Sequence, residues 1–262
     1  MKRYLFALLC STYLFSFGFI FSKHRGLIGI LCSHFRRAQA PQEEMPVPLL
    51  PTTAAGTLFP DSTPIVVREP EAADGNVSPL ELIVLCRLVS SLRPSRLFEI
   101  GTFDGRTTLN LAANSPAEAV VYTLDLPRSA LDTTCLPLAA DDRKYIDKAV
   151  SGSKFAHTDC ERKIIQLWGD SAKFDFSPYE GNMDFVFVDA SHSYEYVLQD
   201  SRTALTLLRP AGGLILWHDY GTPFWSGPTK ALNELILAGG AFAGLRWISG
   251  SSLAYLAVGA RA

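Results

Sequence analysis

The stretch "LFEIGTFDGRTT", residues 97–108, decides the fold class because it joins a short apolar strand to a glycine turn and a helix start. The usual dinucleotide fingerprint is G-x-G-x-x-G, whose second glycine lets the backbone approach a pyrophosphate. Phe103 occupies the position of that second glycine, and the next glycine is Gly105. The turn alone therefore does not determine which ligand is bound, and the residues at the ends of the other strands are needed to decide.

Short apolar runs alternate with helical patterns along residues 78–262, which is typical of a parallel sheet covered by helices on both faces. The end of the chain differs, because two strand-like runs flank a Gly-Ser-Ser turn and predict an antiparallel hairpin. We therefore expect an α/β fold with a doubly wound, mostly parallel, seven-stranded sheet and an antiparallel C-terminal hairpin. The predicted strands are 96–100, 120–124, 164–168, 184–188, 213–217, 245–249 and 253–258.

Each of the first five predicted strands ends at or near an acid, and ligands of doubly wound sheets bind outside the carboxyl ends of the strands. Asp125 follows Gly101 by 24 residues, the placement of an acid that binds ribose hydroxyls in dinucleotide enzymes. Glu99 lies inside an apolar strand, where a carboxyl group needs a partner. An acid such as Asp170 can equally cap a helix or lie in a solvated loop. The strand-end residues of interest are Glu99, Gly101, Asp125, Asp170, Ser171, Asp189, His192, His218 and Asp219.

The composition excludes several classes of function. Of the 262 residues, 48% are hydrophobic and 19% are charged, so the chain can bury a substantial core. Residues 1–42 hold six basic residues and no acid, which leaves 18 basic against 26 acidic residues in the remainder. A nucleic-acid partner is therefore not expected, since phosphate neutralisation needs a basic face. The cysteines include no C-x-x-C pair, so no cysteine zinc site is predicted.

Residues 1–40 form a separate hydrophobic and basic segment. Lys2 and Arg3 precede an uncharged apolar run, residues 4–21, which is just long enough to cross a bilayer as a helix. We expect a retained membrane anchor. Cleavage as a signal, organelle targeting and a soluble buried helix remain open as alternatives.

Residues 41–77 are predicted to be a linker. Eight of the 16 prolines lie between Pro41 and Pro79, and proline removes backbone donors and fixes φ, which favours an extended tether. The folded domain, residues 78–262, begins with "SPLE". This is a capping box in which Ser78 is the N-cap and Glu81 caps in return.

Five motifs follow one another at compatible spacing. They are "EIGTFDGRTT", "VYTLDLP", "GDS", "FVDASHSYEYV" and "LRPAGGLILWHDYG". Together they resemble the Rossmann-like class I S-adenosylmethionine-dependent methyltransferases over roughly residues 78–258. They look most like the small-molecule O-methyltransferase branch, which includes the catechol, caffeoyl-CoA and macrocin-type sugar methyltransferases.

The resemblance implies that S-adenosylmethionine is the cofactor, and this cofactor has no pyrophosphate for a second glycine to admit. Gly101 would let the backbone approach its methionine portion, and the helix start after Gly105 would favour its carboxylate. The resemblance assigns the ribose to Asp125, the adenine edge to Asp170 and Ser171, the amino-acid end to Glu99 and Thr107, and packing beside that end to Phe103.

Methyl transfer is an in-line displacement, so the acceptor oxygen has to be aligned and has to lose its proton. In the resembling enzymes a divalent metal holds the acceptor, and the positions carried over are Asp189, His218 and Asp219. His218 departs from the family pattern, in which this position is commonly an acid, and a mixed site would suit Mn, Fe or Zn as well as Mg. Metal-free general-base catalysis by His192 or His218 is the alternative. A third reading is that both histidines only hydrogen-bond loop backbone.

The segment 127–163 is too long for an ordinary connection between strands. Within it, "DDRKYIDKAV" predicts an amphipathic helix that serves as a lid over the site or as a contact in a homo-oligomer. Residues 220–225, directly after the fifth predicted strand, carry the aromatic side chains that are best placed for the acceptor.

We therefore expect an S-adenosylmethionine-dependent methyltransferase that acts on a hydroxyl oxygen of a small-molecule acceptor. The cytosolic supply of the cofactor favours a cytoplasmic catalytic domain. A nucleotide-dependent oxidoreductase is an alternative, which Phe103 and the missing third glycine disfavour. A non-catalytic module that binds the cofactor or a partner is the other alternative.

Overall fold

The computed structural model describes residues 2–16, 18, 24, 27, 45–59 and 63–259. It divides the chain into two compact units, Met1–Glu44 and Met45–Ala262. In the first unit, helix α1 spans Lys2–Ser16. Within the described part of the chain, no helix is both long and apolar enough to span a membrane. The anchor expected over residues 4–21 reaches beyond α1 into residues outside the description, so it stays a prediction.

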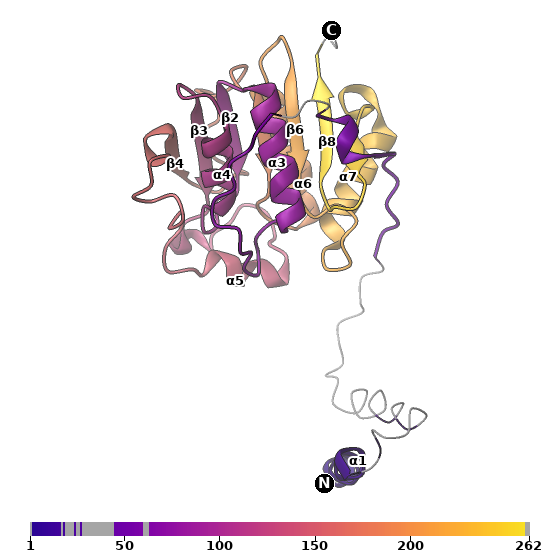
Figure 1. The fold of residues 1–262 in the computed structure, drawn as a ribbon. Helices are drawn as coiled ribbons and strands as arrows, with labels where there is room; N and C mark the ends of the chain where they lie inside the picture. The colour runs from indigo at the N-terminus through magenta and orange to yellow at the C-terminus, as the bar shows by residue number, and fades with distance from the viewer. Residues whose placement is uncertain are drawn as a thin grey trace. The chain divides into compact units, whose positions relative to one another are not determined.

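The second unit is built on one eight-stranded sheet with the order β1-β7-β8-β6-β5-β2-β3-β4. Figure 1 labels β4, β3, β2, β6 and β8, which follow one another across the view. All neighbouring strands are parallel except β8, which is antiparallel to both β6 and β7. The predicted doubly wound sheet and terminal hairpin are thus confirmed. The strands are β1 Thr52–Thr53, β2 Arg96–Ile100, β3 Val120–Asp125, β4 Ile164–Trp168, β5 Phe185–Val188, β6 Gly213–Trp217, β7 Arg246–Ile248 and β8 Ala254–Val258.

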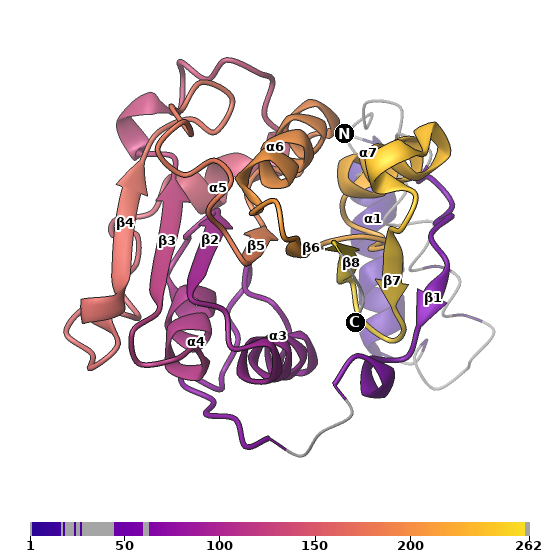
Figure 2. The ribbon, with the colours of Figure 1, turned by 90° about the horizontal axis from the view of Figure 1, so that it is seen from above.

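Helices cover both faces of the sheet. Figure 2 shows α3 and α4 on one face and α6 and α7 on the other. The predicted capping box starts α3: the Ser78 hydroxyl accepts from the Glu81 amide, and the Glu81 carboxylate accepts from the Ser78 amide. The helices are α3 Pro79–Leu92, α4 Arg106–Asn114, α5 Arg143–Ile146, α6 Tyr194–Leu207 and α7 Ser226–Ala238.

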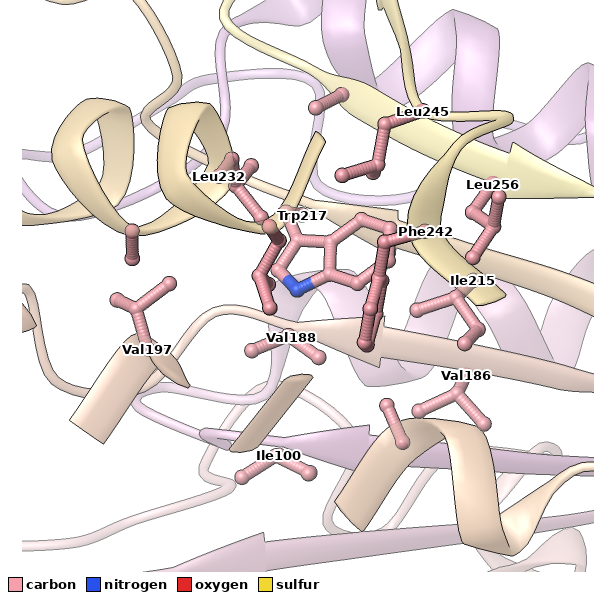
Figure 3. Close-up of a cluster of buried hydrophobic side chains, with 14 of the residues drawn as sticks. Ile100, Val186, Val188, Val197, Ile215, Trp217, Leu232, Phe242, Leu245 and Leu256 are labelled. Atoms are coloured by element: carbon pink, nitrogen blue, oxygen red, sulfur yellow. The ribbon is translucent and has the colours of Figure 1, made fainter. Parts of the chain in front are cut away.

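The period of two in the strands divides the buried side chains between the two faces. In β6, Leu214 and Leu216 pack with α3 and α4, whereas Ile215 and Trp217 pack with α6 and α7. Figure 3 shows Trp217 at the centre of the hydrophobic cluster on the side of α6 and α7. Its indole N–H donates to the Ser201 hydroxyl of α6 at 2.9 Å, so the buried donor is satisfied.

The sheet has one more strand than predicted, and it comes from the proline-rich linker. β1 pairs in parallel with β7, and the amides of Leu49 and Leu50 donate to the Tyr220 hydroxyl at 2.7 and 2.9 Å. The compact unit therefore begins at Met45 rather than at residue 78. Residues 45–53 are extended, as expected, but they are docked on the domain by backbone hydrogen bonds.

The chain runs from β2 outward through β3 to β4 and then returns to β5 beside β2. This reversal between β2 and β5 is the topological switch point, where ligands of doubly wound sheets bind. The segment between β3 and β4 contains only one turn of helix, α5, beside short 3-10 turns. The amphipathic helix predicted from "DDRKYIDKAV" is therefore much shorter than expected.

Candidate active site

A cavity of about 500 Å³ opens at the carboxyl ends of β2, β3, β5 and β6, and the segment between β3 and β4 forms part of its wall. It brings together most of the site residues that the sequence predicts. Three predicted residues, Glu99, Gly105 and Thr107, are not among its lining residues. The predicted residues that line it are Gly101, Phe103, Asp125, Asp170, Ser171, Asp189, His192, His218 and Asp219.

Asp125 ends β3 and lies on the cavity wall. Lys148, from the segment after β3, forms an ion pair with its carboxylate at 2.8 Å. The Ser151 hydroxyl donates to the same carboxylate oxygen. Because both partners belong to the segment that forms part of the cavity wall, the acid predicted to bind ribose also anchors that part of the wall.

Asp170 follows β4 and is almost fully buried. Its carboxylate accepts from the Cys135 amide at 2.7 Å, the Tyr196 hydroxyl at 2.8 Å and the Ala172 amide at 3.0 Å. Burial alone would raise the pKa of Asp170, but these hydrogen bonds outweigh it and lower the pKa. Asp170 therefore organises the loop that presents Ser171 to the cavity.

Glu99 lies within β2 and is 1% exposed. Its carboxylate accepts from the hydroxyls of Thr108 and Thr123. Burial raises its pKa to about 8, and these hydrogen bonds offset only part of the increase. Two threonine hydroxyls thus provide the hydrogen bonds that this buried acid requires. Because Glu99 does not line the cavity, its predicted role at the cofactor's amino-acid end stays a prediction. Thr107 likewise is buried in α4.

The glycine turn after β2 is shaped by contacts within the protein. Gly101 has φ +105°, and a Cβ atom there would lie 2.0 Å from the carbonyl oxygen of Asp189. Gly105 has φ +85°, and a Cβ atom there would meet Phe155 at 2.6 Å. Both positions need glycine because neighbouring loops approach closely. Phe103, between them, has φ 50° and lines the cavity.

A cluster of three possible ligand residues lies at the ends of β5 and β6. Nδ1 of His218 is 3.1 Å from a carboxylate oxygen of Asp189 and 3.1 Å from one of Asp219. One ligand atom from each of the three residues lies within 4.8 Å of the others. Asp219 has φ 61°, in the left-handed region that few residues with a Cβ atom adopt. The residues predicted from the family resemblance are therefore brought together.

The other ring nitrogen of His218, Nε2, lies 3.3 Å from the carboxylate of Glu81 at the start of α3. Burial opposes a charge on His218, but the charges of Asp189 and Asp219 hold its pKa well above the usual value. Burial likewise raises the pKa of Glu81, yet the hydrogen bond and charge of His218 lower it strongly overall. The sequence indicates Glu81 only as a helix cap, because its contact with His218 depends on how α3 packs on the sheet.

His192 is held between two acids. Its Nδ1 lies 2.5 Å from Asp142 and its Nε2 lies 2.8 Å from Asp219. Burial lowers the pKa of His192, but these two acids outweigh it and raise the pKa to about 9. In this arrangement both nitrogens of His192 are engaged and the ring is charged, so it is not a ready general base. Asp142 was missed by sequence reasoning, since nothing near it in the sequence marks it.

Aromatic rings form another wall of the cavity. The ring of Trp225 stacks on His192 with centroids 4.1 Å apart and an angle of 14°. Tyr145 packs edge-on against Trp225 at 6.4 Å and against Phe103 at 5.7 Å. Trp225 and Phe224 line the cavity as predicted, but Tyr220 does not: it is fully buried under residues 49–50.

Comparisons with known proteins agree with this architecture. A family model described as "Methyltransferase domain" matches residues 98–220. Among curated proteins, a caffeoyl-CoA O-methyltransferase from Stellaria longipes is 29% identical over 157 residues, which cover 60% of this chain and 57% of that relative. The match thus spans little more than half the length of the relative.

Solved structures share the fold. A proposed O-methyltransferase from Klebsiella pneumoniae has a TM-score of 0.50 at 18% identity, with 72% of this chain and 84% of that chain covered. A proposed caffeoyl-CoA O-methyltransferase from Staphylococcus aureus also has a TM-score of 0.50, at 15% identity, with 76% and 86% covered. At these identities the likeness establishes the fold.

Proposed function

We propose that this chain, which carries a class I methyltransferase domain, transfers the methyl group of S-adenosylmethionine to a hydroxyl oxygen of a small molecule. One observation carries the proposal: a single cavity at the switch point holds Asp125 at the end of β3 and the cluster Asp189, His218 and Asp219 at the ends of β5 and β6. The match to the methyltransferase domain, residues 98–220, includes all four residues.

The cofactor would occupy the part of the cavity between the glycine turn and β4. Asp125 would accept the ribose hydroxyls, and the loop held by Asp170 would face the adenine edge with Ser171. The sulfonium makes the cofactor a cation, and the acids lining the cavity suit a positive charge. Phe103 stands where the dinucleotide fingerprint has its second glycine, the residue that lets the backbone approach a pyrophosphate, and this supports S-adenosylmethionine over NAD.

A divalent metal fits the cluster at the other end. Two carboxylates and one imidazole nitrogen converge there, and this mixed donor set suits Mn, Fe or Zn as well as Mg. Asp189, His218 and Asp219 would be its protein ligands. When bound, the ion would orient the acceptor hydroxyl and lower its pKa.

The chain's own residues would supply the remaining requirements of the reaction. The acceptor O–H would release its proton to solvent water as it binds. Its oxygen would then form a bond to the methyl carbon while the carbon–sulfur bond breaks, which leaves a neutral thioether. The in-line geometry requires the acceptor to be held close to the cofactor. Tyr145 and Trp225 would hold it against the cluster and exclude water. His192, held as a cation by Asp142 and Asp219, would fix the orientation of Asp219.

Neither alternative function has comparable support. An oxidoreductase would need a pyrophosphate site, which the turn at Phe103 does not offer. A non-catalytic binding module has no use for a converging set of ligand groups beside the cofactor cavity. Membrane attachment through residues 4–21, a cytoplasmic domain and self-association stay predictions, to be checked by membrane fractionation and by sedimentation of the full chain.

Calorimetric titration of S-adenosylmethionine, and separately of NAD, into the protein tests the proposal. We expect micromolar binding of S-adenosylmethionine and no binding of NAD. A panel of phenolic and sugar hydroxyl acceptors, with and without EDTA, would then measure turnover by the release of S-adenosylhomocysteine. Binding of NAD alone would overturn the proposal in favour of the oxidoreductase.

A further inference from the structure

Glu81 makes more contacts than its place in a capping box requires. A capping-box glutamate needs one bond to the N-cap amide, which Glu81 makes through Oε2 to Ser78 at 2.8 Å. In addition, its Oε1 accepts from both the amide and the hydroxyl of Ser252 at 2.6 Å. Its side chain is only 7% exposed. The start of α3 and the turn before β8 therefore hold the carboxylate in one orientation.

This carboxylate sets the orientation of the His218 ring. Oε2 of Glu81 lies 3.3 Å from Nε2, on the side of the ring away from Asp189 and Asp219. With an ion on Nδ1, the one proton left on the ring would be on Nε2, where the Glu81 carboxylate accepts it. The opposite nitrogen, Nδ1, is then the one directed at the two cavity acids.

We propose that Glu81 is a positioning residue that makes Nδ1 of His218 the nitrogen donor of a site for a divalent transition ion, with Asp189 and Asp219 as its oxygen donors. The inference rests on the proposed function, because it concerns the same cluster. Metal-binding histidines usually donate their second ring N–H to a carboxylate or carbonyl, which fixes the ring and makes it a better donor.

The donor set decides which ion the site prefers. Mg²⁺ favours an all-oxygen shell that includes several waters, whereas an imidazole nitrogen favours Mn²⁺, Fe²⁺, Co²⁺ or Zn²⁺. This chain supplies an imidazole, His218, with a carboxylate, Glu81, behind it. The pair Glu81 and His218 would therefore change the selectivity of the site from magnesium towards transition ions.

Co²⁺ binding provides the test, because the visible absorption of protein-bound Co²⁺ reports both affinity and coordination without any turnover. The full chain in mild detergent is titrated with Co²⁺ as wild type, as Glu81→Gln and as the control Ser78→Ala. The control weakens the helix cap but keeps the carboxylate beside His218. We expect Glu81→Gln to bind Co²⁺ about tenfold more weakly or worse, with an altered spectrum, and Ser78→Ala to match wild type.

A second measurement covers the case in which Glu81→Gln does not fold. Nitrogen NMR of the His218 ring in wild type should show a proton on Nε2 and a large shift of Nδ1 alone when Zn²⁺ is added. Zn²⁺ at Nε2, a Co²⁺ affinity equal in wild type and Glu81→Gln, or no ion binding by wild type would each overturn the inference. If one of these results is found but S-adenosylmethionine still binds in calorimetry, the proposed function stands although the inference about Glu81 fails. If S-adenosylmethionine does not bind either, the proposed function fails as well.

Discussion

A carboxylate oxygen of Asp142 lies 2.5 Å from Nδ1 of His192, although 50 positions separate the two residues in the chain. The other oxygen of Asp142 accepts from the His192 amide at 3.1 Å and from the Ser191 hydroxyl at 2.6 Å. Through these hydrogen bonds, the buried carboxylate of Asp142 connects the segment between β3 and β4 to the loop after β5. It does so at the wall of the cavity, next to Asp219.

Replacing Asp142 should therefore impair turnover more than cofactor binding. Asp142→Ala removes a charge-assisted hydrogen bond, worth about 1.5–3 kcal/mol, from His192. We expect kcat to fall about tenfold or more, while the calorimetric affinity for S-adenosylmethionine changes little. Asp132→Ala, which removes an exposed acid of the same segment, is the control. Equal kcat values in the two variants would contradict a positioning role for Asp142.

Asp125 is the residue on which cofactor affinity should depend most. Asp125→Ala should weaken binding of S-adenosylmethionine about tenfold or more, because charge-assisted hydrogen bonds to the ribose would be lost. Calorimetry measures this change, with the surface variant Asp147→Ala as the control. An unchanged dissociation constant for Asp125→Ala would remove this residue from the ribose site.

Replacing Asp219 should abolish turnover but leave cofactor binding nearly unchanged. Asp219→Ala removes an acid that contacts both His192 and His218, so we expect no measurable turnover. Its affinity for S-adenosylmethionine should stay within a few-fold of wild type, because the cluster lies at the acceptor end. Release of S-adenosylhomocysteine at the wild-type rate would rule out the metal model, and so would full activity of wild type after extensive dialysis against EDTA.

Much of the fold could be predicted because the strands carry their own signals. The bounds of β2, β4 and β6 agree with the predicted strands residue for residue, since each is a short apolar run between turn residues. β1 could not be predicted. It has two residues, and it is defined by backbone pairing with β7, nearly two hundred residues later.

Some residues of the candidate site could likewise be predicted from the sequence, and others could not. Asp125 ends a strand and Asp189 and Asp219 come just after strands, and the carboxyl ends of parallel strands meet at one edge whatever the loops do. Glu81 and Asp142 lie in a helix start and an irregular segment, so their contacts with His218 and His192 depend on packing between distant elements. The sequence marks Glu81 only as a helix cap, and nothing in the sequence near Asp142 marks that residue.

Asp200 should make the stability of the domain depend on pH. Neither of its carboxylate oxygens has a hydrogen-bond partner of normal geometry among the described residues. Burial raises its pKa to about 7, and the nearby Ser171 hydroxyl offsets this only in part. In the unfolded chain the pKa is about 3.9. Between these values the folded state keeps a proton that the unfolded state releases, so stability falls as the pH rises from about 4 to about 7.

Asp200→Asn removes this pH-dependent loss. Relative to wild type, we expect the variant to gain free energy of unfolding, on the order of 2 kcal/mol, between about pH 5 and about pH 8. Urea unfolding at several pH values measures the difference, and Asp132→Asn at the surface serves as the control. A constant difference between Asp200→Asn and wild type across this range would contradict the raised pKa.

The strap of residues 45–53 should be part of the folded domain rather than a tether. Leu50 is 4% exposed within the hydrophobic core, and the strap binds the hydroxyl of Tyr220, the residue after Asp219. A chain that starts at Met45 should therefore keep the midpoint of thermal unfolding and the cofactor affinity of the full chain. Removing residues 1–53 should lower both, and Leu50→Ala should cost about 2–5 kcal/mol of unfolding free energy. Equal midpoints for the two shortened chains would show that the docked strap contributes nothing, and the domain would then begin nearer residue 78.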